Sequence, residues 1–226
     1  MRIPRQYRRT SMASLLVLWV IVPGTASAQT GGAACFNLTA TIAGTNDSDT
    51  ITGTEGPDVI DGRGGNDVID GLGGADLICG GLGSDVLQGG SGTDTMIGDG
   101  GADSLFGGED ADVLRSGAGD DVHGGPGDDL LRALGKDQGA DSLRGEEGDD
   151  TLMASDGDDL VSGGEGNDTA TSGSGNDRVS GDAGDDELHA GSGDDTVDGG
   201  VGFDRCNGGD GVDMVTGCEL AKNAES

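Results

Sequence analysis

One aliphatic side chain recurs at every ninth position along most of the chain, and its neighbours are mostly polar residues or glycine. Each nine-residue row, such as Gly80–Gln88, is numbered here so that the aliphatic residue is position 8. Because successive side chains of a strand point to opposite faces, positions 7–9 predict a short strand with one inward residue. The glycine-rich first six positions predict a tight turn, since glycine readily adopts positive φ. The inward residues are Ile51, Ile60, Ile69, Ile78, Leu87, Met96, Leu105, Leu114, Leu131, Leu143, Leu152, Val161, Val179, Leu188, Val197 and Val215, with His123, Ala170 and Cys206 as departures.

An aspartate recurs with the same period at position 6 of nineteen rows. If two rows complete one coil, residues 18 apart stack at the strand spacing of about 4.8 Å, and the carboxylates form two columns. In the first half of the chain one column runs through Asp49, Asp67, Asp85, Asp103 and Asp121, and the other through Asp58, Asp76, Asp94 and Asp112. The remaining predicted members are Asp129, Asp141, Asp150, Asp159, Asp168, Asp177, Asp186, Asp195, Asp204 and Asp213.

The row pattern Gly-Gly-x-Gly-x-Asp-x-aliphatic-x, as in Gly80–Gln88 and Gly89–Ile97, resembles the RTX (hemolysin-type) calcium-binding nonapeptide over residues 44–216. The resemblance implies an all-β fold, a right-handed parallel β-roll solenoid of about nineteen rows with two rows per coil. It also implies that the nineteen aspartates bind several Ca²⁺ ions. Stacked carboxylates and turn carbonyls would form all-oxygen pockets, which suit calcium better than magnesium. Rows such as 62–70 shift a glycine from position 2 to position 3, which leaves their turn geometry open.

Composition and charge support an ion-dependent fold. The 226 residues include 49 Gly and only 2 % aromatic residues, a composition typical of disorder unless the glycines are periodic, as they are here. One inward side chain per row makes a small core, so we expect calcium binding and folding to be one process. The net charge of −31 argues against binding to nucleic acid or to anionic membranes, which carry charge of the same sign, and favours cations.

The N-terminus is typical of a secretory signal peptide over residues 1–28. Four arginines precede an apolar stretch at 15–22, and Ala-Ser-Ala ends the segment at 26–28. Eight apolar residues are far fewer than the ~20 needed to span a membrane, and we expect no membrane span elsewhere. Export by the general or the twin-arginine route remains open. We therefore predict a secreted, extracellular protein, which could also be held at the cell surface.

The predicted organisation beyond the signal peptide depends on one irregularity in the spacing. The interval from Asp121 to Asp129 is one residue shorter than nine, and the interval from Asp129 to Asp141 is three residues longer than nine. This indicates either a hinge between two rolls or a loop that bulges from one continuous roll. The predicted segments are an N-terminal cap (29–43), a calcium-binding roll (44–129), an irregular break (130–135), a second roll (136–216), and a C-terminal cap and tail (217–226).

Four cysteines in an exported chain favour disulfides. Cys206 and Cys218 lie twelve residues apart at the end of the repeats, and we expect them to pair and close the last coil. Cys35 precedes the first row and Cys79 lies in the fourth, and these two are expected to pair if the N-terminal segment folds back. The alternative for all four is free, partly buried thiols.

Catalytic signatures are missing from the sequence. It contains no His-Glu-x-x-His zinc motif and no Gly-x-Ser-x-Gly elbow, and His123 and His189 are interpreted as packing irregularities. RTX toxins and proteases carry a catalytic or pore-forming domain that these repeats do not supply. We therefore predict a non-enzymatic, structural or surface calcium-binding protein. The alternatives are an adhesin-like or other partner-recognition module, whose protein or glycan partner is unknown, and a degenerate enzyme or toxin.

Overall fold

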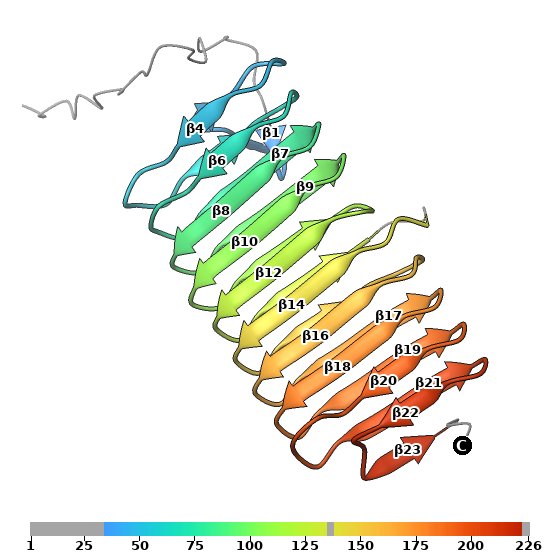
Figure 1. Cartoon of the computed structure of the whole chain (residues 1–226). Helices are drawn as coiled ribbons and strands as arrows, with labels where there is room; N and C mark the ends of the chain where they lie inside the picture. The colour runs from blue at the N-terminus through green and yellow to red at the C-terminus, as the bar shows by residue number, and fades with distance from the viewer. Residues whose placement is uncertain (1–33, 135–137, 223–226) are drawn as a thin grey trace, which may run out of the picture.

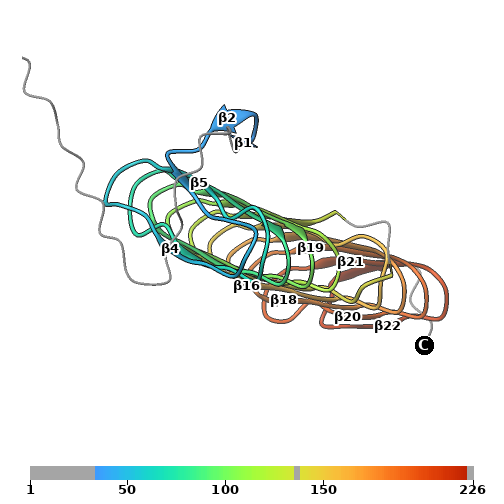
Figure 2. The same cartoon turned by 90° about the horizontal axis from the view of Figure 1, so that it is seen from above.

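The computed structural model describes residues 34–134 and 138–222, which form a parallel β-solenoid with two facing sheets (Figure 1). The predicted signal peptide lies outside the described residues. Successive strands alternate between the sheets, so each coil contributes one strand to each sheet. Figure 2 shows the coils stacked one behind another, with β1 and β2 beside the first coils. The predicted all-β roll of two rows per coil is confirmed.

The even-numbered strands from β4 onward form a ten-stranded sheet and the odd-numbered strands from β3 onward an eleven-stranded sheet. The first sheet comprises β4 (Thr50–Thr52), β6 (Val68–Asp70), β8 (Val86–Ser91), β10 (Ser104–Glu109), β12 (Asp121–Pro126), β14 (Ser142–Glu147), β16 (Leu160–Glu165), β18 (Arg178–Ala183), β20 (Thr196–Asp198) and β22 (Met214–Thr216). The second comprises β3 (Ile42–Ala43), β5 (Val59–Asp61), β7 (Leu77–Leu82), β9 (Thr95–Gly100), β11 (Val113–Ser116), β13 (Leu130–Ala133), β15 (Thr151–Met153), β17 (Thr169–Ser174), β19 (Glu187–Ser192), β21 (Arg205–Asp210) and β23 (Leu220–Lys222).

Strand register follows the 18-residue spacing. Leu87 pairs with Ile69 on one side and with Leu105 on the other, so identical row positions stack along the roll. The stacked position-8 side chains form a narrow core between the sheets, and each regular row contributes one of them. The buried core residues are Ile51, Ile60, Ile69, Ile78, Leu87, Met96, Leu105, Leu114, Val122, Leu131, Ala133, Leu143, Leu152, Val161, Ala170, Val179, Leu188, Ala190, Val197 and Cys206.

The expected inward position of His123 is wrong. Val122 is fully buried in the core, whereas His123 lies on the outer face of β12 and stacks on Phe106 with 5.0 Å between ring centroids. The reason is the turn between Ser116 and Asp120, which has three residues (117–119) where a regular turn has four. The shorter turn moves β12 back by one position and exchanges the faces of its side chains.

The sheets continue past the irregular rows. Leu131 pairs with Leu114 in β11 and with Leu152 in β15, so residues 130–133 of the predicted irregular segment are a regular strand. The departures from nine residues lie in two turns, one from Ser116 to Asp120 and one from Ala133 to Asp141. Part of the second turn lies outside the described residues.

Disulfides hold both ends of the roll, and both predicted pairings are present. Cys35–Cys79 joins β7 to the antiparallel pair β1 (Ala34–Cys35) and β2 (Leu38–Thr39), with 5.8 Å between Cα atoms. Cys206–Cys218 joins β21 to the segment before β23, with 6.0 Å between Cα atoms. The first disulfide thus ties the N-terminal hairpin to the roll across 44 residues of sequence, and the second ties the last strands together across 12.

Candidate metal centre

The position-6 aspartates line up immediately before the strands. The backbone N–H of each one donates to the Oδ1 atom of the aspartate one coil later, as from Asp76 to Asp94 at 2.8 Å and from Asp94 to Asp112 at 2.7 Å. These bonds are buried and repeat along both edges of the roll. The carboxylates therefore occupy two continuous columns, which the 18-residue spacing predicted.

One predicted member of the columns is wrong. Asp120, not Asp121, is buried and accepts the N–H of Asp103 at 2.7 Å. Asp121 begins β12 at an outward position, where its half-exposed carboxylate accepts a hydrogen bond from Arg144 at 2.8 Å. The short turn before β12 causes this exchange as well. The signal was present in the sequence, because counting back nine residues from Asp129 reaches Asp120.

The other predicted aspartates all lie in the columns. One column contains Asp49, Asp67, Asp85, Asp103, Asp120, Asp141, Asp159, Asp177, Asp195 and Asp213. The second contains Asp58, Asp76, Asp94, Asp112, Asp129, Asp150, Asp168, Asp186 and Asp204.

Three residues that sequence reasoning missed close the ends of these columns. Thr45 and Thr54 each donate a hydroxyl and a backbone N–H to the Oδ2 atom of the first aspartate, Asp49 and Asp58 respectively, at 2.6–2.9 Å. At the other end Glu219 accepts the N–H of Asp204 at 2.7 Å. The two threonines share row position 2 in the sequence. Nothing in the local pattern indicated Glu219, because its turn lacks three residues of the row.

Between these ends the second carboxylate oxygen is buried and accepts no hydrogen bond within the described part of the chain. An isolated buried carboxylate oxygen carries a large desolvation cost. A bound cation would remove that cost, because it replaces the missing donors and neutralises the charge. The Oδ2 atoms concerned are those of Asp67, Asp76, Asp85, Asp94, Asp103, Asp112, Asp129, Asp150, Asp159, Asp168, Asp177, Asp186, Asp195, Asp204 and Asp213.

Burial also changes the proton affinity of these carboxylates in the metal-free chain. Desolvation raises the pKa of Asp112 and of Asp150 to about 7, against the lowering effect of the backbone N–H that each accepts. Neighbouring column aspartates, such as Asp129 beside both of them, raise it further. For the same leading reason the pKa of Asp94 lies at about 6. In the metal-free chain Asp112 and Asp150 are thus only partly ionised near neutral pH.

A pH dependence follows for the metal-free protein. The ordinary aspartate pKa is 3.8, so between about pH 4 and pH 7 the folded chain binds more protons than the unfolded chain. The free energy of unfolding therefore falls as the pH rises. In metal-free buffer we expect more β-structure near pH 5.5 than near pH 8, measured by circular dichroism. Equal β content at both pH values, or more at pH 8, would contradict this assignment.

The turns before the aspartates keep one backbone shape in spite of sequence differences. In row 80–88, Gly81 and Gly83 have φ of 106° and 134°. Arg63 and Leu72 stand at position 2 of earlier rows and adopt positive φ of 77° and 72°, although side chains other than glycine rarely do so. The stacked strands thus impose the turn on these rows, which resolves the geometry that the sequence left open.

A second ladder runs along the outside of the turns at position 5. The N–H of Asp194 donates to Asn176 Oδ1 at 2.9 Å, and the N–H of Asn176 donates to Asp158 Oδ1 at 2.8 Å. The frequent Asp, Asn and Ser at this position were a possible signal. These side chains accept hydrogen bonds from the neighbouring coil and so hold the turns in register. They are exposed to solvent, unlike the Oδ2 atoms at position 6, which are buried without a donor.

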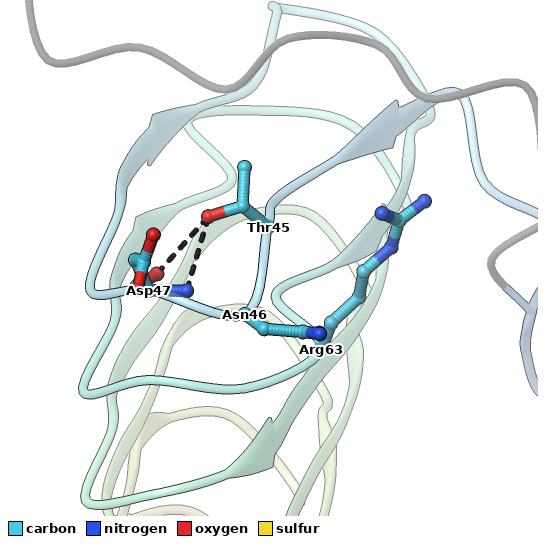
Figure 3. A pocket seen from close by; sticks show the side chains of 4 residues that line it. All are labelled: Thr45, Asn46, Asp47 and Arg63. Atoms are coloured by element: carbon cyan, nitrogen blue, oxygen red, sulfur yellow. Dashed lines mark hydrogen bonds between the residues drawn. The ribbon is translucent and has the colours of Figure 1, made fainter.

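At the first turn Thr45, Asn46 and Asp47 line a hollow with Arg63 (Figure 3).

The donor set fits calcium. Within the described ranges no three acidic, histidine or cysteine side chains converge on one point, so a cation between two coils would take its remaining ligands from turn carbonyls and water. A carboxylate column beside glycine-rich turns offers only oxygen atoms in a flexible arrangement. Calcium prefers six to eight such ligands, whereas magnesium demands stricter geometry.

Comparison with protein families agrees with this donor chemistry. The family described as RTX calcium-binding nonapeptide repeat matches residues 43–78, 55–87, 73–105, 80–114, 88–122, 137–170 and 171–206. The chain belongs to this RTX family. The RTX matches leave out residues 123–136, next to the two turns that depart from nine residues. A search of curated proteins found no match.

Proposed function

We propose that this RTX chain is an exported calcium-binding protein that folds into its roll as it binds Ca²⁺, with a structural role at the cell surface or in the extracellular matrix and without catalysis. The observation that carries the proposal is the set of fifteen buried aspartate Oδ2 atoms, spread over both columns, that lack a hydrogen-bond donor. A divalent ion between neighbouring coils would satisfy two such charges at once. Because calcium would bind only the folded chain, its binding free energy would add to the free energy of folding.

Two observations support an extracellular location. Disulfides such as Cys35–Cys79 persist in oxidising compartments, and the N-terminal residues have the composition of a signal peptide. Extracellular calcium-binding modules have dissociation constants of about 0.1–1 mM. Cytosolic calcium is far too low to fill such sites, so the chain would cross the membrane unfolded and fold outside. No helix within the described ranges is long and apolar enough to cross a membrane.

The histidines support a role without catalysis. His123 Nδ1 lies 2.9 Å from Glu146 Oε1, and its Nε2 lies 3.4 Å from Asp121 Oδ2. Arg144 completes this surface network, which crosses from β12 to β14 and is explained by strand-to-strand pairing. His189 is exposed beside Glu187, at 3.3 Å. Both histidines thus contact charged side chains on the outer faces of the sheets.

A partner-recognition module is the second candidate, because the face of one sheet differs from the acidic edges. At row positions 7 and 9 the outward residues of β9, β11, β13 and β15 carry no carboxylate and include Arg115 and Arg132, which are paired in register. Such a surface of apolar, hydroxyl and basic side chains could contact a protein or glycan. These outward residues are Thr95, Ile97, Val113, Arg115, Leu130, Arg132, Thr151 and Met153.

Equilibrium dialysis of the oxidised protein against about 1 mM calcium, the range of extracellular modules, tests the proposal. Metal analysis is expected to find several calcium ions per chain, because each column offers many neighbouring pairs of carboxylates. An equal concentration of magnesium should displace few of them. Retention of less than one calcium ion per chain would overturn the proposed function.

A further inference from the structure

The two edges of the roll are built differently. The "glycine edge" is defined by the nine turns that begin at Gly53, Gly71, Gly89, Gly107, Gly124, Gly145, Gly163, Gly181 and Gly199. The "mixed edge" is defined by the ten turns that begin at Gly44, Gly62, Gly80, Gly98, Ser116, Ala133, Ala154, Ser172, Ala190 and Gly208. The first residue of each turn is row position 1, and the column aspartate is row position 6. Both edges are visible in Figure 1 as the two rows of turns that join the sheets.

Both irregular turns lie on the mixed edge. On the glycine edge every turn reaches its aspartate five residues after its glycine, from Gly53 to Asp58 through to Gly199 to Asp204. On the mixed edge Asp120 follows Ser116 by four residues, and Asp141 follows Ala133 by eight. The glycine edge is therefore an unbroken stack of turns of equal length, whereas the mixed edge is interrupted near its middle.

Position 1 borders the oxygens that a cation would need. A Cβ placed on Gly107 would lie 2.5 Å from Asp112 Oδ2 and 2.5 Å from the carbonyl oxygen of Gly124, one coil later. Carbon and oxygen atoms cannot approach so closely, so a side chain there displaces one oxygen or the other. Glycine at position 1 thus leaves space between a carboxylate oxygen and a carbonyl oxygen of neighbouring coils.

Five consecutive turns of the mixed edge begin with alanine or serine instead of glycine and so carry a Cβ at position 1. Ser116, Ala133, Ser172 and Ala190 are buried, and Ala154 is partly buried against the core. The Ser172 hydroxyl donates to the carbonyl oxygen of Ala190 at 2.7 Å, so that carbonyl already has a partner. A methyl or hydroxymethyl group in this position offers a cation less room and fewer free oxygens.

We infer that the two edges bind calcium with different strength: the glycine edge is a continuous row of tight sites, and the mixed edge binds more weakly from Ser116 to Ala190. This inference rests on the proposed calcium function. Orphaned Oδ2 atoms, such as that of Asp177, occur on the mixed edge too, so those turns still attract calcium but fill last. The roll would then be held along one edge by ions and, in its second half, along the other by packing and hydrogen bonds.

Isothermal titration calorimetry of calcium binding to the oxidised full chain tests this inference. The wild type is expected to show two classes of site whose affinities differ by about tenfold, or 1.4 kcal/mol. The triple variant Ala133→Gly, Ala154→Gly, Ala190→Gly should move ions from the weak to the tight class. Gly163→Ala, on the glycine edge, should move ions from the tight to the weak class. The backbone φ of Gly163 is not in the positive range, so alanine is compatible with the backbone there, but its Cβ would collide with Asp168 Oδ2 and force that oxygen to move.

The outcomes separate the inference from the function on which it rests. A single class of sites in the wild type that neither variant alters would overturn the difference between edges and leave calcium binding intact. No calcium binding to the wild type would overturn both. If Gly163→Ala fails to fold, the triple variant decides alone, because a tight class that does not grow in it contradicts the inference.

Discussion

In excess chelator near pH 8, the oxidised protein is expected to show the circular dichroism spectrum of an unstructured chain, and to gain a β spectrum cooperatively at about 0.1–1 mM calcium. The physical reason is the combination of a core one side chain wide with two buried columns of negative charge. Without a cation each carboxylate such as Asp112 must lose its hydration, face its column neighbours and leave Oδ2 without a donor. These free-energy costs exceed the stabilisation that comes from burying one aliphatic side chain per row.

Magnesium provides the control for this titration. It carries the same charge but retains its water ligands and prefers octahedral geometry, so it should restore little β-structure at the same concentration. Sodium chloride at matched ionic strength separates screening from binding. A full β spectrum in chelator near pH 8 would mean that the roll is stable without calcium, and the coupling of folding to binding would then be abandoned.

The second large effect is expected from a pair of neighbouring aspartates. Asp150 is a buried column residue on the glycine edge, and Asp149 is exposed at position 5 of the same turn. In saturating calcium, Asp150→Asn is expected to lower the free energy of unfolding by about 1–3 kcal/mol, the range for an unsatisfied buried polar group. It replaces an ionised ligand oxygen by an amide while retaining an acceptor for the N–H of Asp129.

Asp149→Asn is the matched control, because it removes the same charge one residue away. Asparagine already serves at position 5 in Asn167 and Asn176, so this variant should leave calcium affinity and thermal melting nearly unchanged. Melting is followed by circular dichroism at fixed calcium. Equal effects of both substitutions in calcium would show that charge alone, and not the column, decides stability.

The repeat by itself determined the architecture of this protein. Each nine-residue row contains glycines, one aspartate and one aliphatic residue, such as Asp85 and Leu87. The glycines favour a turn and the aliphatic residue a short strand, and both preferences depend only on residues within the row. Stacking of rows 18 residues apart then follows from pairing like positions, as Leu87 does with Leu105. The carboxylate columns and the narrow core are direct consequences of that register.

Register across the irregular rows was decided only in three dimensions. Asp120 and Asp121 are both compatible with the local pattern, and either could precede a strand. Pairing of β12 with β10 and β14 buries Val122 in the core, which forces Asp120 into the column and turns Asp121 outward. A strand side chain has only two faces, so burying the correct apolar residue determines where every neighbour points.

The ends and the edges of the roll also depended on the tertiary structure. Glu219 reaches Asp204 because the last turn is short and the adjacent Cys218 is bonded to Cys206, a contact that no repeat position specifies. The sequence shows alanine or serine at some turn starts, but only the coil order assigns those residues to one edge. The physical reason is that a repeat encodes contacts between like positions, whereas its interruptions find their partners only when the whole stack has formed.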